Sequence, residues 1–149
     1  MNYSSVEQEL DASGYLCMTP LGRSMWPMLR GGRDNVYLEK AEGQLQEDDV
    51  ALFRTEAGKY ILHRVIQAES DHYIFRGDNV VDNVEYVLPS QVVAVLKRFY
   101  RGKRWISCES EKYKIYVAIW KQIYPIRKII MRCRHRMVGL VKKMTGRNR

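Results

Sequence analysis

The chain has 149 residues, of which 46% are hydrophobic and 28% charged, and its formal net charge is +8. This length is typical of one domain with an appendage, and the hydrophobic share is ordinary for a globular protein. The three cysteines (Cys17, Cys108 and Cys133) are odd in number and lack metal-site spacing. We therefore expect no disulfide framework, no metal site and no cofactor.

The first residues predict a short helix. The string MNYSSVEQELDASG is polar and acidic, unlike a secretory signal peptide. Ser4 or Ser5 suits the N-cap of this helix, and Gly14 suits its end. A strand is expected directly afterwards, at 14–18.

The string GRSMWPMLR gives Ser24 a setting that favours function. Gly22 lets the backbone approach a substrate closely, and Pro27 stiffens the segment after the serine. Such a turn can hold the Ser24 N–H toward a developing oxyanion. Met25 and Trp26 are candidates for the wall of a pocket for a small side chain. The same string also fits an ordinary loop that enters a short apolar turn.

His63 is the candidate general base. The run KYILHRVIQ at 59–67 is rich in β-branched and aromatic residues and predicts a strand. Alternation puts Ile61, His63 and Val65 on one face, which we expect to be covered. A serine hydroxyl needs a neighbouring base, usually with a third group that orients it. The alternative is a core histidine satisfied by a backbone carbonyl.

The string RGDNVVD supplies two candidates for the third group. Residues 77–79 (GDN) are turn chemistry that follows the expected strand HYIFR. Asp78 or Asp82 can accept the imidazole N–H of His63, which would fix its tautomer. One carboxylate suffices, so at least one of the two is expected to have a structural role.

The three strings together resemble the signal peptidase I family. Residues 24–27 (SMWP) are similar to its Ser-Met-x-Pro box, and residues 77–79 to its Gly-Asp-Asn box. Residues 63–65 (HRV) resemble the base box of the endoplasmic-reticulum and archaeal type, which has His where the bacterial type has Lys. The resemblance spans residues 20–98. It implies a serine endopeptidase that cleaves a leader or signal-type peptide from a peptide or preprotein substrate.

The chain also departs from the pattern of that family. The family generally has an N-terminal transmembrane anchor, and we expect none in this chain. The longest charge-free run in the C-terminal part, 115–120, is also far too short to span a bilayer. The interval from Asp78 to Asp82 is shorter than is usual for the His type. The choice between the two aspartates therefore stays open, with Asp82 the first candidate and Asp78 the second.

The intervening elements are mostly short strands. We expect strands at 14–18, 35–40, 49–54, 59–67, 72–76, 91–100 and 103–107, with hairpin turns at 56–58 and 101–102. Such intervals predict a mainly β fold, a small coiled sheet or barrel, which is also what the resemblance implies. We place the catalytic domain at 1–110 and a helical tail at 111–149.

The tail is strongly basic. Residues 1–96 carry a net charge of −7, and residues 97–149 one of +15. From Ile126 to Met144 the apolar residues fall within a helical sector of about 120°, while Pro125 is expected to break the helix before it. A basic amphipathic helix suits an anionic membrane surface. The residues expected at that surface are Trp120, Arg127, Lys128, Arg132, Arg134, Arg136, Lys142 and Lys143.

Together these patterns predict a serine peptidase associated peripherally with a membrane, on its cytoplasmic face. One alternative is a non-catalytic peptide-binding or adaptor protein of the same fold, tethered by its tail to an anionic membrane or another polyanion. Another is a tail that packs on the β domain and leaves its charges solvated. The chain has no recognised DNA or RNA motif, so we expect no specific nucleic-acid partner.

Overall fold

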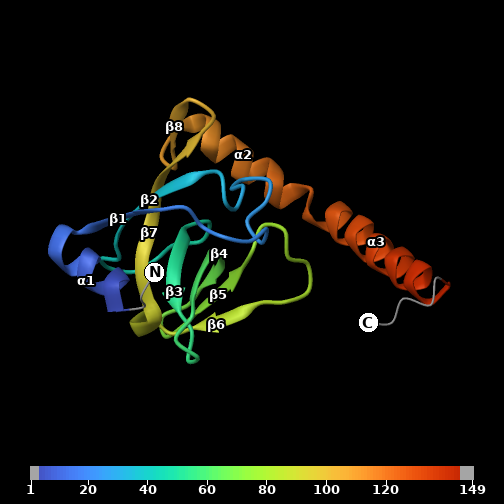
Figure 1. Cartoon of the computed structure of the whole chain (residues 1–149), viewed down its shortest axis with the longest axis horizontal. Helices are drawn as coiled ribbons and strands as arrows, with labels where there is room; N and C mark the ends of the chain where they lie inside the picture. Colours follow the sequence, from blue (N-terminus) through green and yellow to red (C-terminus); the bar gives the residue numbers. More distant parts are fainter. Residues whose placement is uncertain (1–3, 145–149) are drawn as a thin grey trace. The chain divides into compact units, whose positions relative to one another are not determined.

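The computed structural model describes the backbone of residues 4–144 and the side chains of residues 6–133 and of Met137. The chain divides into two compact units, Met1–Tyr113 and Lys114–Arg149. The first unit holds a helix and an antiparallel sheet of eight strands, and the second is helical (Figure 1). The expectation of a mainly β fold with a helical C-terminal part is confirmed.

The N-terminal helix, α1 (Ser4–Ser13), ends where its sequence predicts. Gly14 has φ +78°, a conformation that favours glycine, and its N–H donates to the carbonyl of Leu10 at 2.8 Å. Val6 and Leu10 lie one turn apart and are 6% and 2% exposed. They anchor α1 beside β1 and β2.

The sheet has the order β1-β2-β7-β3-β4-β5-β6, and β8 pairs with the end of β7. All neighbouring strands are antiparallel. Figure 1 shows β7 as the long strand through the sheet, with β8 folded back on it by a tight hairpin. The strands are β1 (Tyr15–Met18), β2 (Asn35–Lys40), β3 (Val50–Arg54), β4 (Tyr60–Ala68), β5 (Tyr73–Arg76), β6 (Glu85–Val87), β7 (Val92–Arg101) and β8 (Arg104–Ser107), with a short 3-10 helix η1 (Pro89–Gln91) before β7.

The sheet is open, so of the two expected forms, a coiled sheet or a barrel, the closed barrel is excluded. β1 and β6 form its two edges, and no pairing joins them in the part of the chain that the structure describes. A barrel closes only when its edge strands meet along their length. Here the edges are strands of four and three residues, which offer little length for such pairing.

The core lies against the centre of the sheet. Phe53 of β3 and Phe75 of β5 are 1% and 0% exposed, and their ring centroids lie 4.8 Å apart. Burying each of these rings stabilises the fold by about 1.5–3 kcal/mol. Tyr73 is also buried, and its hydroxyl accepts a hydrogen bond from the backbone N–H of Leu45 at 3.1 Å. The same cluster contains Leu45, Ala51, Val65 and Val87.

The C-terminal part contains two helices. α2 (Glu111–Gln122) and α3 (Tyr124–Met144) are separated at Ile123, just before Pro125. Proline lacks an N–H and clashes with the preceding turn, so it is tolerated at the start of α3 and not inside a continuous helix. The expected break is therefore present. None of the helices among the described residues is both long and apolar enough to cross a membrane.

Candidate active site

Ser24 lies in the irregular segment between β1 and β2. The backbone of this segment turns sharply: Trp26 N–H donates to the Arg23 carbonyl at 3.1 Å, and Leu29 N–H to the Met25 carbonyl at 2.8 Å. Met25 and Leu29 are 5% and 2% exposed, so they anchor the turn in the protein interior. Ser24 itself is half-buried. Apolar side chains thus fix the loop that carries the serine.

Two glycines allow this loop to fold tightly. Gly22 has φ +91°, a region that L side chains rarely adopt. Gly31 approaches it so closely that a Cβ atom on Gly31 would lie 1.8 Å from the Gly22 carbonyl oxygen. Any side chain at Gly31 would force these two ends of the loop apart.

His63 lies in the middle of β4, opposite Ala51 of β3, and is 5% exposed. Its ring meets the edge of Phe53, with centroids 6.4 Å apart. The expected covered face of the strand is confirmed, since Val65 is fully buried on it. His63 is therefore held rigidly by strand pairing and by aromatic packing.

The carboxylate beside His63 belongs to Glu85. Its Oε2 atom lies 3.0 Å from His63 Nδ1, and the side chains of His63 and Glu85 are 7% and 29% exposed. The order of the strands brings the two residues together. Val65, two residues after His63 on β4, pairs with Phe75 of β5, and Phe75 pairs with Glu85 of β6. The local sequence around His63 did not predict Glu85 as its partner, because the two residues lie 22 positions apart.

Gly77 lies between His63 and the loop that carries Ser24 between β1 and β2, here called the serine loop. A Cβ atom on Gly77 would lie 2.7 Å from the Ser24 carbonyl oxygen and 2.9 Å from His63 Nε2. The nitrogen that faces away from Glu85 therefore points toward the backbone of the serine loop. Asn79 adds two links, from its N–H to the Ser24 carbonyl at 2.7 Å and from its Nδ2 to the Arg23 carbonyl at 3.2 Å.

Ser24 and His63 line the same cavity, of about 490 Å³. In the part of the chain that the structure describes, no hydrogen bond joins Ser24 Oγ to His63 Nε2. Catalytic hydrogen bonds are often loose in empty sites and tighten when substrate binds. The other lining residues are Met18, Thr19, Pro20, Leu21, Gly22, Met25, Leu29, Gly31, Leu52, Tyr60, Ile61 and Leu62.

Two of the three residues expected at the substrate pocket line this cavity. Gly22 and Met25 are among its walls. Trp26, the third, is not among the described residues that line the cavity, and it is 51% exposed. Both residues lie at the end of the turn that the Trp26 N–H closes on the Arg23 carbonyl, and there Met25 is buried while Trp26 faces solvent. The apolar residues contributed by β3 and β4 could not be found from a local string.

Asp78 pairs with Arg64 in the structure. Arg64 Nε and Nη2 lie 2.8 Å from the two carboxylate oxygens, and both side chains are almost fully buried. Arg64 Nη1 also donates to the Asp48 carbonyl at 2.8 Å and to the Tyr113 hydroxyl at 3.1 Å. Burial lowers the pKa of Arg64, but the hydrogen bonds and charge of Asp78 outweigh it and hold that pKa above its ordinary value.

The pair gives Asp78 a structural role. It fixes the Gly77–Asn79 turn to β4 one residue beyond His63, and the same turn contacts the serine loop. Asp82, the other aspartate, is exposed. The carboxylate that lies at Nδ1 of His63 is thus Glu85, and neither aspartate takes that position.

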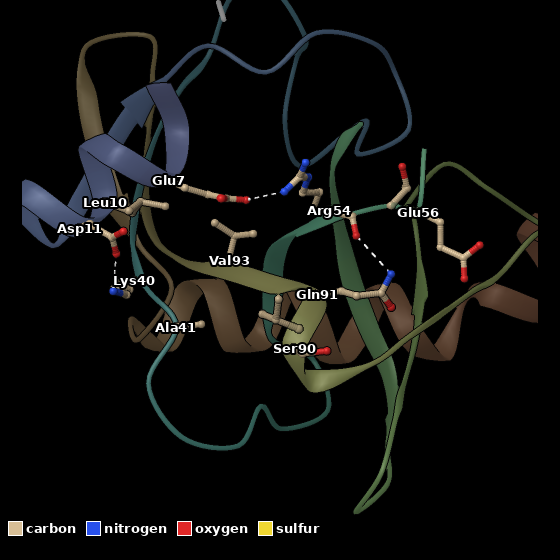
Figure 2. Close-up of a pocket in the computed structure, with 12 residues that line it drawn as sticks. Glu7, Leu10, Asp11, Lys40, Ala41, Arg54, Glu56, Ser90, Gln91 and Val93 are labelled. Carbon is tan, nitrogen blue, oxygen red and sulfur yellow. Dashed lines mark hydrogen bonds and ion pairs between the residues drawn. The ribbon is translucent and has the colours of Figure 1, made fainter. Parts of the chain in front are cut away.

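A second cavity, of about 580 Å³, lies between α1, the end of β2 and the start of β7. Figure 2 shows Glu7 extending from α1 toward Arg54, and Asp11 toward Lys40. The Tyr60 hydroxyl donates to Glu7 Oε1 at 2.8 Å, and Tyr60 lines the Ser24 cavity. Burial and this hydrogen bond raise the pKa of Tyr60. The Tyr60–Glu7 hydrogen bond therefore links one residue from the lining of each cavity.

Among the residues with described side chains, no group of three or more His, Cys, Asp or Glu is arranged to hold a metal ion. Of the residues expected at a membrane surface, Trp120, Arg127, Lys128 and Arg132 have described side chains. The side chains of Arg134, Arg136, Lys142 and Lys143 lie outside the described residues.

No protein-family model matches the chain, and no curated protein sequence matches it.

Proposed function

We propose that this protein is a serine endopeptidase that cleaves a leader or signal-type peptide. One observation carries the proposal: Ser24 and His63 line one cavity and both adjoin Gly77, while the opposite ring nitrogen of His63 lies 3.0 Å from Glu85. Serine hydrolases use a hydroxyl, an imidazole and a carboxylate in that order, the imidazole lying between the other two groups. The resemblance of residues 20–98 to signal peptidase I adds support.

In the proposed mechanism, Ser24 Oγ attacks the carbonyl carbon of the scissile bond, and His63 Nε2 accepts the hydroxyl proton. Backbone N–H groups, that of Ser24 among them, bind the oxyanion of the tetrahedral intermediate. His63 then donates its proton to the leaving amine, and an ester to Ser24 remains. A water molecule that gives a proton to His63 hydrolyses the ester and restores the serine. Glu85 holds the imidazole in the required tautomer.

The cavity supports a substrate with a small apolar side chain before the scissile bond. Its walls include Met18, Leu52 and Leu62. β1 is an edge strand that leads directly into the cavity through Met18 and Thr19. An extended peptide can add to the free edge of β1 by main-chain hydrogen bonds and pass Ser24.

We further propose that the protein binds peripherally to a membrane, on its cytoplasmic face. The net charge of +15 in residues 97–149 complements the anionic lipids of that leaflet. A peptidase at this surface would meet substrates as they approach or leave the membrane.

A non-catalytic peptide-binding protein is the second candidate. The described residues show no hydrogen bond between Ser24 Oγ and His63, and this favours a protein that binds peptides without cleaving them. In that case the cavity and the β1 edge would bind a peptide without cleaving it.

A covalent serine probe separates the two candidates. The purified protein is treated with a peptidyl fluorophosphonate, and the labelled residue is located by mass spectrometry. A peptidase is expected to carry the probe on Ser24, and labelling is expected to fall strongly in His63→Ala. Ser110→Ala serves as the matched control, since Ser110 lies in the connection before α2. Absent labelling would favour the binding protein, and labelling that persists in Ser24→Ala would contradict Ser24 as the nucleophile.

A further inference from the structure

α3 has an apolar face that the described residues of its own unit do not cover. Ile126, Ile129 and Ile130 are 61%, 65% and 60% exposed, and Met137 is 65% exposed. At 100° per residue these four positions fall within a sector of about 100° on one side of the helix. Within Lys114–Arg149 the described elements are the rest of α2 and α3 itself, so this unit supplies no second layer to bury that face.

The flanks of this apolar face are basic. Arg127, Lys128 and Arg132 lie on the helix outside the isoleucine sector. Residues 114–149 contain 11 Lys and Arg and no Asp or Glu. The unit is therefore complementary to a negatively charged partner along its whole length.

Aromatic side chains border the basic face at the junction of α2 and α3. The rings of Tyr116 and Trp120 are stacked with centroids 5.9 Å apart, and the Arg127 guanidinium lies 3.3 Å from the Trp120 ring centroid. Lys128 Nζ lies 5.9 Å from the ring centroid of Tyr124. The Tyr116 hydroxyl oxygen and Trp120 Nε1 are buried, so the Trp120 ring supports the Arg127 side chain.

We propose that α3 docks on an anionic lipid bilayer, with Ile126, Ile129 and Ile130 at the acyl boundary and Arg127, Lys128 and Arg132 at the lipid phosphates. A nucleic acid would use the positive charges and leave the exposed isoleucines in water, whereas a bilayer uses both. The inference deepens the peripheral location proposed above and rests on it. It does not depend on the chemistry of Ser24.

Vesicle flotation with the full chain tests the docking surface. Vesicles of phosphatidylcholine alone are compared with vesicles that contain about one-third phosphatidylglycerol. We expect binding to the anionic vesicles at least about tenfold tighter than to the neutral ones, with a marked loss at high salt. Equal binding to both, or binding to neither, would overturn the proposal.

Two variants with matched controls identify the face. Ile126→Ser with Ile129→Ser is expected to weaken binding about tenfold or more. The control is Ile115→Ser with Ile119→Ser, which are 57% and 53% exposed on α2 and are expected to leave binding unchanged. Circular dichroism of each protein checks that the helices are retained. Equal effects of the two pairs would overturn the assignment to α3.

The basic face is tested by charge removal. Arg127→Gln, Lys128→Gln and Arg132→Gln together are expected to weaken binding to anionic vesicles about a hundredfold. The control removes three exposed charges from residues 1–96, Arg30→Gln, Arg33→Gln and Lys59→Gln, and is expected to leave binding unchanged. Binding to a DNA duplex that is tighter than binding to anionic vesicles, and insensitive to the isoleucine variant, would overturn the lipid assignment.

Flotation needs no turnover, so it separates this inference from the peptidase proposal. Ser24→Ala is expected to float as the wild-type chain does. A chain that floats but never cleaves would overturn the peptidase alone. A chain that cleaves but never floats would overturn the docking surface alone.

Discussion

The Nδ1 atom of His63 lies 3.0 Å from Glu85 Oε2, although the two residues are 22 positions apart in the chain. This contact leaves Nε2 facing Gly77 and the serine loop. In serine hydrolases the carboxylate at the remote nitrogen orients the imidazole and stabilises its charged form. In the proposed peptidase, Glu85 therefore takes the orienting role that the sequence suggested for Asp82 or Asp78.

Replacing Glu85 by glutamine is expected to lower kcat by about 100-fold or more, because the amide can favour the wrong imidazole tautomer. Asp82→Asn is the matched control. Asp82 is exposed, and its change is expected to alter kcat by less than about threefold. Steady-state cleavage of one peptide by both variants measures the difference. A larger loss in Asp82→Asn would return the orienting role to that aspartate.

Gly77→Ala is expected to abolish cleavage and labelling of Ser24. The added Cβ would lie 2.7 Å from the Ser24 carbonyl oxygen and 2.9 Å from His63 Nε2, so the serine loop and the imidazole must move apart. Small displacements of reacting groups are costly to catalysis.

Gly102→Ala provides the comparison for Gly77→Ala. Gly102 has φ +67° in the β7–β8 turn, and its Cβ would meet nothing within 4 Å. This variant is expected to lose about 1 kcal/mol of stability through backbone strain while it keeps its activity. Thermal unfolding and probe labelling are measured for both variants. Equal labelling of the two would argue against a close contact at Gly77.

Asp78→Ala is expected to destabilise the fold by about 3–5 kcal/mol, because it leaves Arg64 buried without its charge partner. Urea unfolding followed by circular dichroism measures this loss. The double change Arg64→Met with Asp78→Leu is expected to recover much of the stability, since it removes both buried charges. Asp71→Ala, at an exposed pair with His72, should leave the unfolding midpoint almost unchanged. Similar midpoints for Asp78→Ala and Asp71→Ala would contradict the buried-pair account.

The cysteines are expected to differ in reactivity. Burial raises the pKa of the Cys108 thiol to about 11, whereas Cys17 and Cys133 are exposed. A raised pKa lowers the thiolate fraction below it, so at pH 8 only about one Cys108 in a thousand is ionised. Peptide mapping after brief iodoacetamide treatment should find Cys17 and Cys133 modified well before Cys108. Modification of Cys108 first would place that thiol at the surface.

Most strands were predictable because alternation and turn residues are local signals. The strand at Asn35–Lys40 was predicted with its observed bounds, and the others agree within one residue at each end. β6 was missed because Glu85–Val87 has only three residues and directly follows an irregular loop. The choice between an open sheet and a barrel depends on whether β1 meets β6, which no local pattern reports.

The site was predictable only in part, for the same reason. Ser24 and His63 each stand in a recognisable string, and the structure places both on one cavity. The partner of His63 depends on the order β4-β5-β6, which brings Glu85 across two strands. The burial of Arg64 likewise follows from contacts with Asp78 and Tyr113, which lie 14 and 49 positions away.

The proposed peptidase requires that Ser24, activated by His63, cleave peptide bonds. Its most direct test is to incubate a library of proteome-derived peptides with the purified wild-type chain and with Ser24→Ala, and to identify new peptide ends by mass spectrometry. We predict cleavage at a defined set of bonds by the wild-type chain, with small apolar residues before them, and none by Ser24→Ala. Equal cleavage by the two proteins, or no cleavage by either, would contradict the account.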